Sequence, residues 1–290
     1  MTMDWNKLIS AKRFGLEEYH RERQENRSEF QRDYDRLIFS APFRRLQNKT
    51  QVFPLPGSIF VHNRLTHSLE VSCVGRSLGN DVSKALLERH PELGDSYLTE
   101  IGSIVSAACL AHDLGNPPFG HSGERAISTF FSEGKGLPLK EELSKAQWED
   151  LIHFEGNANA FRLLTHQFEG RRKGGFVLTY STLASIVKYP YSSKLAGQKS
   201  KFGFFKPEEE SFRRIADELG MKQLSDEEYD TFSGYVLDAL GGSLPDDNES
   251  FELDLEEMII KAKMGTEHRI DEAVVRLKPK PQKQNEEEND

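Results

Sequence analysis

Residues 111–121 read Ala-His-Asp-Leu-Gly-Asn-Pro-Pro-Phe-Gly-His, and this stretch ends one helix and begins another. An apolar run rich in small residues precedes it, from about Leu98 to Leu114, and predicts a buried helix. The Gly-Asn-Pro-Pro sequence at 115–118 terminates that helix. Residues 120–132 have the pattern of a further short helix. His112 and Asp113 therefore lie at the C-terminal end of a nearly all-apolar helix.

His112 and Asp113 have the chemistry of a metal site. A buried carboxylate needs a cation or a hydrogen-bond donor, because an unpaired charge is costly to bury. An imidazole and a carboxylate on adjacent residues can reach one cation beyond the helix end, and this nitrogen and oxygen set suits Mn, Fe, Zn, Co or Mg. His67, within the amphipathic stretch 64–70, is a third candidate ligand. The alternative is an ordinary helix C-terminal pair.

His121 is a candidate general acid or base. Gly120 and Gly123 free the backbone around it, and Glu124 follows three residues later. If residues 120–132 are helical, His121 and Glu124 share a helix face, so the carboxylate can orient the imidazole and raise its basicity. The alternative is a solvent-exposed His–Glu pair in an N-terminal helix turn.

The remainder of the N-terminal part also predicts helices. Apolar residues recur at helical spacing in the charge-rich stretch 16–45, in 64–90 and in 153–168, with a polar connection at 133–147. Residues 176–180, Phe-Val-Leu-Thr-Tyr, are the exception and resemble a strand. We therefore expect a mainly α fold up to about residue 224.

Composition excludes several classes of protein. The 290 residues carry a net charge of -9 and contain only two cysteines, Cys73 and Cys109. Two cysteines in apolar helical patterns do not make a disulfide framework and favour a reducing cytosol, so we expect a cytoplasmic protein. With a mean hydropathy of -0.62 and no apolar run near 18 residues, no membrane span is expected. The N-terminus lacks the layout of a secretory signal.

The charge is divided unevenly along the chain. Residues 225–290 contain 19 acidic and 7 basic residues, whereas residues 1–224 contain 28 acidic and 31 basic residues. The first part is therefore mildly basic (+3) and the second strongly acidic (-12). Such asymmetry indicates separate modules, and the basic part is the one suited to an anionic ligand.

The pattern changes after residue 224. Residues 228–240 form an amphipathic helix pattern, and short strand patterns follow at 251–255, 258–260 and 273–277. Residues 279–290 are polar, acidic and without apolar anchors, which predicts a disordered tail. The expected domains are thus 1–224, a helical domain, and 225–278, a small α+β module.

Several motifs in the same order resemble those of the HD-domain deoxynucleoside triphosphate triphosphohydrolases of the bacterial dGTPase type. The resemblance covers about residues 1–224 and implies an HD-domain helical bundle. Its motifs are the runs 44–53, 64–71, 111–121, 188–193 and 201–205.

This resemblance implies metal-dependent hydrolysis of a dNTP, with dGTP favoured, to deoxynucleoside and tripolyphosphate. Position by position, it implies His67, His112 and Asp113 as metal ligands, with Mn or Mg favoured and Fe, Co or Zn possible. It implies His121 and Glu124 as the catalytic pair. The implied substrate-binding residues are Arg64, at the α-phosphate, Gln51, at the sugar or base, and the weaker candidates Lys188 and Tyr189. A homohexamer is expected by family analogy alone.

The sequence departs from this family after residue 224. The family's metal site is closed by one more aspartate, in a later helix that this sequence lacks, so the domain is incomplete relative to the family. Asp238 is the nearest substitute, although a solvated residue is the favoured interpretation. Residues 225–278 resemble instead the transporter-associated domain of CorC/HlyC-type proteins, which implies a fusion. We therefore expect the activity to be impaired by the missing ligand.

Three alternatives stay open at this stage. The chain is a nucleotide- or nucleic-acid-binding remnant without catalysis, fused to a small regulatory domain. Or it is another HD-type phosphohydrolase, although the His121–Glu124 extension and the Gln51 run argue against this. Single-stranded nucleic acid could also stack on Phe202, Phe204 and Phe205, but packing of this loop on its own domain is favoured.

Overall fold

The computed structural model divides the chain into two compact units, residues 1–226 and 227–290. The structure describes residues 4–19, 27–49, 63–94, 96–170, 173–193, 201–221, 236, 240, 245–255, 258–265 and 270–278. Gln51, Asp238, the tail 279–290 and most of the predicted helix 228–240 lie outside these ranges. Within these ranges, no helix is both long and apolar enough to cross a lipid bilayer.

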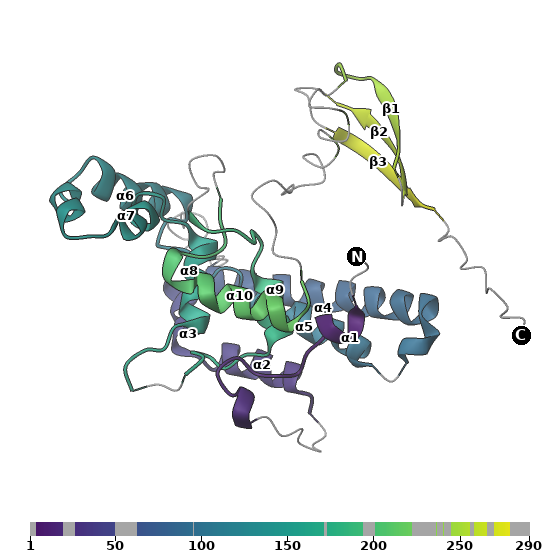
Figure 1. Ribbon diagram of the computed structural model, residues 1–290, viewed down its shortest axis with the longest axis horizontal. Helices are drawn as coiled ribbons and strands as arrows, with labels where there is room; N and C mark the ends of the chain where they lie inside the picture. Colours follow the sequence, from purple (N-terminus) through teal and green to yellow (C-terminus); the bar gives the residue numbers. More distant parts are fainter. Residues whose placement is uncertain are drawn as a thin grey trace, which may run out of the picture. The chain divides into compact units, whose positions relative to one another are not determined.

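The first unit is helical, as the sequence predicts (Figure 1). Its α-helices are α1 (Trp5–Leu8), α2 (Glu29–Ile38), α3 (Ala41–Arg45), α4 (Arg64–Arg89), α5 (Ile101–Ala111), α6 (His121–Ser132), α7 (Lys145–Ile152), α8 (Gly156–Thr165), α9 (Tyr180–Ile186) and α10 (Glu209–Glu218). The core lies around α5, which contacts α2, α4 and α9. Leu110 of α5 belongs to a buried cluster with Phe161 of α8 and Ile215 of α10.

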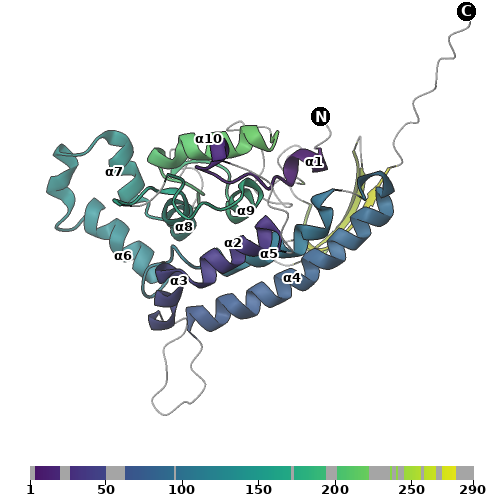
Figure 2. The ribbon, with the colours of Figure 1, turned by 90° about the horizontal axis from the view of Figure 1, so that it is seen from below.

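The long helix α4 lies along α5 and packs through its small residues (Figure 2). Its buried side chains and glycines are Ser68, Ser72, Gly75, Gly79 and Ser83, with Arg64 at its start. A Cβ atom at Gly79 would lie 2.8 Å from the Cα atom of Gly102, so only glycine permits this approach. The Ser72 and Ser106 hydroxyl oxygens lie 2.8 Å apart and join the two helices.

Because α4 packs on α5 through small residues, several of its large apolar side chains are exposed on the opposite face. Val74, Leu78 and Val82, which contribute to the predicted helical pattern, are 61%, 60% and 50% exposed. Hydrophobic periodicity thus identifies the helix, but the residues that face α5 are serines and glycines. The N-terminus of α4 is fixed by a capping box between Asn63 and Thr66.

The strand expected at residues 176–180 is wrong. Val177 has a left-handed φ of 57°, and Tyr180 begins α9. The segment is held by tertiary contacts: the Arg13 guanidinium donates to the Val177 carbonyl oxygen at 2.7 Å, and the Thr179 amide donates to Asp33 at 2.9 Å. These contacts, and the two glycines before it, override the local strand preference.

The second unit contains a three-stranded antiparallel sheet in the order β1-β2-β3. The strands are β1 (Ser250–Asp254), β2 (Met258–Met264) and β3 (Ile270–Leu277). All three lie where the alternating pattern predicts strands, with β2 and β3 longer than expected. Val236, from the predicted helix, is fully buried in a cluster with Ile260 and Ala262 of β2.

Candidate functional site

Helices α4 and α5 bring three predicted ligands together. His67 lies in the first turn of α4, His112 is the C-cap of α5, and Asp113 follows it. One ligand atom from each residue lies within 4.8 Å of the others. The His67 and His112 rings meet edge to face, with centroids 5.3 Å apart. The structure therefore gathers His67, His112 and Asp113 into one cluster, as the sequence predicts.

His112 is oriented by the backbone of its own helix. Its Nδ1 lies 2.7 Å from the Cys109 carbonyl oxygen, which can only accept a hydrogen bond. The proton is therefore on Nδ1, and Nε2 carries a free lone pair. Nε2 points toward Asp113, 3.5 Å from Oδ1. This arrangement of a second nitrogen bonded to a carbonyl is the usual one for a metal-ligating histidine.

Asp113 is a buried carboxylate, 5% exposed, with one oxygen left unsatisfied. Its Oδ1 accepts a hydrogen bond from Asn116 at 2.5 Å. Its Oδ2 lies 2.9 Å from Arg64 Nη1 but has no partner with hydrogen-bond geometry. Charge attraction remains, but the directional bond is missing, and a buried acceptor without one is costly. The donor set thus fits a divalent cation, because Oδ2 and His112 Nε2 both lack a donor.

Basic groups surround this carboxylate. Arg64 also lies against the backbone before His121, because a Cβ atom at Gly120 would be 2.7 Å from Arg64 Nη2. The Lys49 ammonium donates to the Asn116 carbonyl oxygen at 2.7 Å. Burial, helped by the Arg64 charge, lowers the pKa of Lys49. We predicted no role for Lys49, although it lies in the run 44–53.

His121 and Glu124 form the expected pair in the first turn of α6. His121 Nδ1 lies 2.7 Å from Glu124 Oε2, and the imidazole is 73% exposed whereas the carboxylate is 8% exposed. Glu124 Oε1 accepts a hydrogen bond from the Gly156 amide at 3.0 Å. A Cβ atom at Gly156 would lie 2.1 Å from Asn116 Oδ1, so glycine is required at this start of α8.

Lys201 and Glu155 lie next to the His121–Glu124 pair, on the Glu124 side. Lys201 Nζ lies 2.7 Å from Glu155 and 3.5 Å from Glu124 Oε2. Burial raises the pKa of Glu124, but the bonds from His121 and Gly156 and the Lys201 charge outweigh it and lower the pKa overall. Burial likewise lowers the pKa of Lys201, yet its two carboxylate partners raise it overall. Glu124 is therefore held ionised beside His121.

The loop before Lys206 does not present its rings to solvent. Phe202, Phe204 and Phe205 are only 1%, 4% and 5% exposed. Stacking of nucleic-acid bases on these rings, the less favoured expectation, is therefore wrong, because their faces are covered by the protein's own core. Lys201 is used within the site and does not form part of an exposed basic surface.

Two predicted substrate residues, Lys188 and Tyr189, make contacts of their own within the first unit. The Lys188 ammonium lies over the Tyr189 ring, 5.3 Å from its centroid, and Tyr189 packs beside the buried Phe205. Among the described residues, no hydrogen bond or ion pair joins either residue to His67, His112 or Asp113. Gln51 lies outside the described residues. The roles of Gln51, Lys188 and Tyr189 stay predictions.

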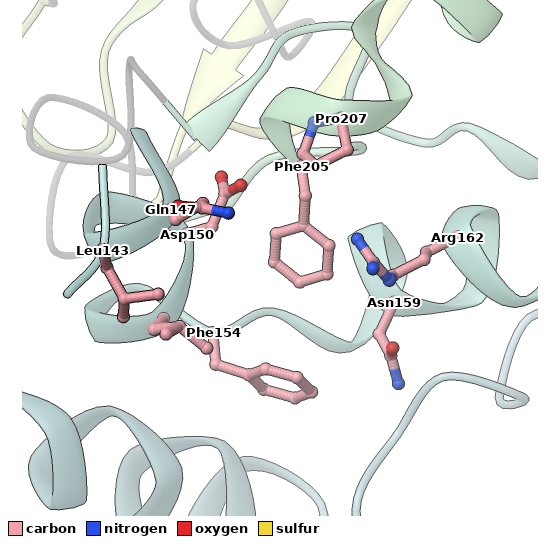
Figure 3. A pocket seen from close by; sticks show the side chains of 9 residues that line it. Leu143, Gln147, Asp150, Phe154, Asn159, Arg162, Phe205 and Pro207 are labelled. Carbon is pink, nitrogen blue, oxygen red and sulfur yellow. The ribbon is translucent and has the colours of Figure 1, made fainter. Parts of the chain in front are cut away.

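A cavity of about 340 Å³ lies beside α7 and α8 (Figure 3). Phe205 points into it opposite Phe154, and Arg162 and Asn159 border it from α8. Asn159 also donates to the Gly115 carbonyl oxygen at 2.8 Å, which attaches α8 to the loop after Asp113. No residue of the metal-ligand cluster or of the His121–Glu124 pair lines this cavity.

Comparison with known proteins identifies the family to which the residues around this site belong. Residues 64–187 match the family described as HD domain. A deoxyguanosinetriphosphate triphosphohydrolase-like protein of Pseudomonas aeruginosa (strain LESB58) is 48% identical over 235 residues, covering 78% of this chain and 52% of the relative. A protein of the same description from Synechocystis sp. is 45% identical, covering 76% and 52%.

A deoxyguanosinetriphosphate triphosphohydrolase of Yersinia enterocolitica is 35% identical over 259 residues, covering 77% of this chain and 50% of the relative. The chain thus spans about half the length of the curated relatives it matches. The match to the HD family begins at Arg64 and contains His67, His112, Asp113, His121 and Glu124. The N-terminal unit of this chain therefore belongs to the HD-domain proteins of the deoxyguanosinetriphosphate triphosphohydrolase type.

Proposed function

We propose that this protein is a metal-dependent phosphohydrolase that cleaves a deoxynucleoside triphosphate, dGTP in the first place, to deoxynucleoside and tripolyphosphate. One observation supports the proposal: ligand atoms of His67, His112 and the buried Asp113 converge, and Arg64 links this cluster to the backbone just before His121. The names of the relatives support the nucleotide class and the guanine base.

The three ligands would hold a divalent cation, with Mn²⁺ or Mg²⁺ favoured by their nitrogen and oxygen donors. When bound, such a cation polarises a phosphoryl oxygen and lowers the pKa of a coordinated water. Three protein ligands leave further positions for water or phosphate oxygens. The additional aspartate that the family resemblance implies has its candidate, Asp238, outside the described residues.

Arg64 would bind the α-phosphate. Its guanidinium lies between Asp113 and the Gly120 backbone, so it faces both the cluster and the start of α6. A fixed cation there offsets the negative charge that develops on the phosphoryl oxygens in the transition state. The nearby Lys49 ammonium adds to the positive field that attracts a triphosphate.

His121 would move the proton. Glu124 Oε2 accepts a hydrogen bond from the Nδ1–H group of His121, whose imidazole is 73% exposed. Nε2 is therefore free to exchange a proton with the substrate. In the reaction, the oxygen of water bonds to the α-phosphorus, the bond from phosphorus to the 5′-oxygen breaks, and the proton that the water loses passes to solvent. Protonated His121 would deliver its proton to that leaving 5′-oxygen, as a general acid.

The test is product analysis with the full chain. We expect Mn²⁺ or Mg²⁺ with dGTP to yield tripolyphosphate and deoxyguanosine, detected by ³¹P NMR and chromatography, and His121→Ala to slow their formation about 10²–10⁴-fold. Release of pyrophosphate or orthophosphate would indicate another HD-type hydrolase. Binding of dGTP without any product from the four dNTPs would contradict catalysis and leave a nucleotide-binding protein.

A further inference from the structure

The sheet of the second unit has two edges of different character. β2 lies between β1 and β3, so β1 and β3 each leave one side unpaired by the strands of the described residues. An edge strand presents free amide and carbonyl groups, which can pair with another strand. Charge on an edge strand repels most partners, but it favours a partner strand whose opposite charges lie across from it.

β3 is exposed on both of its faces. All six residues 271–276 are exposed, and Val274 and Val275 are 68% and 45% exposed. Val275 lies opposite Ile260, which is fully buried in the apolar face of the sheet. The apolar face of the sheet therefore continues to the β3 edge and stops there uncovered.

The charges on β3 are self-complementary in an antiparallel arrangement. Glu272 lies two residues before Val274, and Arg276 lies two residues after it. Neither Glu272 nor Arg276 forms an ion pair with a described residue. If two copies of β3 run antiparallel with Val274 opposite Val274, each Glu272 lies opposite an Arg276 of the other copy.

The register follows from the faces of the sheet. A two-fold axis perpendicular to the sheet keeps both apolar faces on one side, so an even-numbered residue can lie opposite only an even-numbered residue. Shifting the axis to Ala273 or Val275 removes both Glu272–Arg276 pairs. The axis at Val274 makes the pair twice and also places Ala273 opposite Val275 on the apolar face.

We propose that β3 is a dimer interface, at which two copies of this chain join their sheets edge to edge around Val274. The contact is isologous, because each copy supplies the same strand. It extends the three strands of each copy into one continuous antiparallel sheet. It also covers the open end of the apolar face beside Val275.

The β1 edge lacks this complementarity. Its charged residues, Glu252 and Asp254, are both acidic, and self-pairing around Glu252 would place two carboxylates opposite each other. Glu252 is already used within the unit, 2.9 Å from Lys261, and Asp254 pairs with Lys278. Like charges opposite one another destabilise strand pairing, so the partner is expected at β3 and not at β1.

Charge reversal in the full chain tests the interface. We expect Arg276→Glu to weaken self-association about tenfold in analytical ultracentrifugation, because two attractive pairs become repulsive. The double variant Glu272→Arg/Arg276→Glu exchanges the charges and should restore the association. Glu252→Arg, on the other edge, is the matched control and should leave it unchanged. An association that ignores Arg276→Glu, or a double variant that stays weakened, overturns the proposal.

Cross-linking tests the register independently of any contact made by the first unit. In a Cys73→Ser/Cys109→Ser background, Val274→Cys places two thiols across the two-fold axis, where opposite Cβ atoms are about 4.5–5.5 Å apart. A short bifunctional maleimide should give a covalent dimer with Val274→Cys and none with the control Glu252→Cys. Equal yields from both positions, or no dimer from either, would contradict β3 pairing.

Discussion

The metal-ligand cluster and the His121–Glu124 pair are built in opposite ways. In the cluster, a buried carboxylate and two imidazoles meet at the ends of two packed helices. In the pair, an exposed imidazole rests on a buried carboxylate that is fixed by Gly156 and Lys201. The cluster is suited to a cation that stays in place, whereas the pair is suited to a proton that must leave and return.

His121→Ala is expected to have the largest effect and to distinguish the pair from the cluster most clearly. It removes the proton carrier and leaves the cluster intact, so kcat/KM should fall about 10²–10⁴-fold while Mn²⁺ affinity is unchanged. Steady-state kinetics and isothermal titration calorimetry measure the two effects. His90→Ala is the control, because His90 forms a similar pair with Glu92 at 3.1 Å at the far end of α4. A loss of Mn²⁺ binding in His121→Ala would contradict the division.

Asp113→Asn should give the converse result. It keeps the side-chain shape but removes the anion, and we expect Mn²⁺ affinity to fall by at least about 100-fold, since even partners of metal ligands contribute 10–100-fold. The hydrogen bond between His121 and Glu124, followed by NMR, should stay intact. Asp81→Asn, an exposed position on α4, is the control for charge alone. Unchanged Mn²⁺ affinity in Asp113→Asn would remove Asp113 from the ligand set.

A smaller effect is expected from Lys201→Met, which removes the ammonium group next to Glu124. Without this ammonium the pKa of Glu124 should rise, because one of the groups that stabilises its ionised form is lost. Carbon-13 NMR of the Glu124 carboxyl would follow this, and kcat should fall about tenfold. Lys206→Met removes an exposed lysine paired with Glu209 and should change neither. A Glu124 titration identical to that of the native protein would show that Lys201 does not support the pair.

The smallest effect concerns Glu208, a buried carboxylate that pairs with Arg162 of α8 at 3.1 Å. Burial and the neighbouring Asp150 charge raise the pKa of Glu208 to about 7, despite the opposing Arg162. A raised folded-state pKa favours folding while the group is protonated, so this contribution to stability is lost as the pH rises from about 4.5 to 7.

Glu208→Gln cannot ionise and should flatten the pH dependence of the free energy of unfolding in that window. Urea denaturation between pH 4.5 and 8 would measure it, with Glu210→Gln, an exposed neighbour, as the control. Equal slopes for Glu208→Gln and the native protein would show that Glu208 does not titrate differently in the two states.

Local pattern predicted the elements that carry the site. The amphipathic stretch 64–90 became α4, and α5 ends at Ala111, a few residues before both the expected end near Leu114 and the Gly-Asn-Pro-Pro sequence at 115–118. Local chemistry offered His67, His112 and Asp113 as candidate ligands and His121 with Glu124 as a pair, and the family resemblance implied both groups. The structure brings the first three together. The roles of these five residues, and the CorC/HlyC resemblance of residues 225–278, remain predictions.

What the sequence could not supply was contact between distant segments. Lys201 reaches Glu124 and Glu155 only because its loop folds onto α8, and no spacing rule encodes that approach. Lys49 sits beside Asn116 for the same reason. The burial of α4 through serine and glycine was also hidden, because hydrophobic periodicity assigns the interior to the larger apolar residues.

The glycine contact between α4 and α5 bears on the choice of cation. Gly79 and Gly102 meet about three helical turns from His67 and His112, so the separation of the two imidazoles depends on a point far from either ring. Mg²⁺ binds its ligands at about 2.0–2.1 Å, and Zn²⁺ binds histidine nitrogen at a similar distance, so a change of a few tenths of an ångström would weaken either site. The spacing of α4 and α5 therefore controls the spacing of the two imidazoles. A methyl group added at Gly79 would push α4 away from α5 and move His67 away from His112.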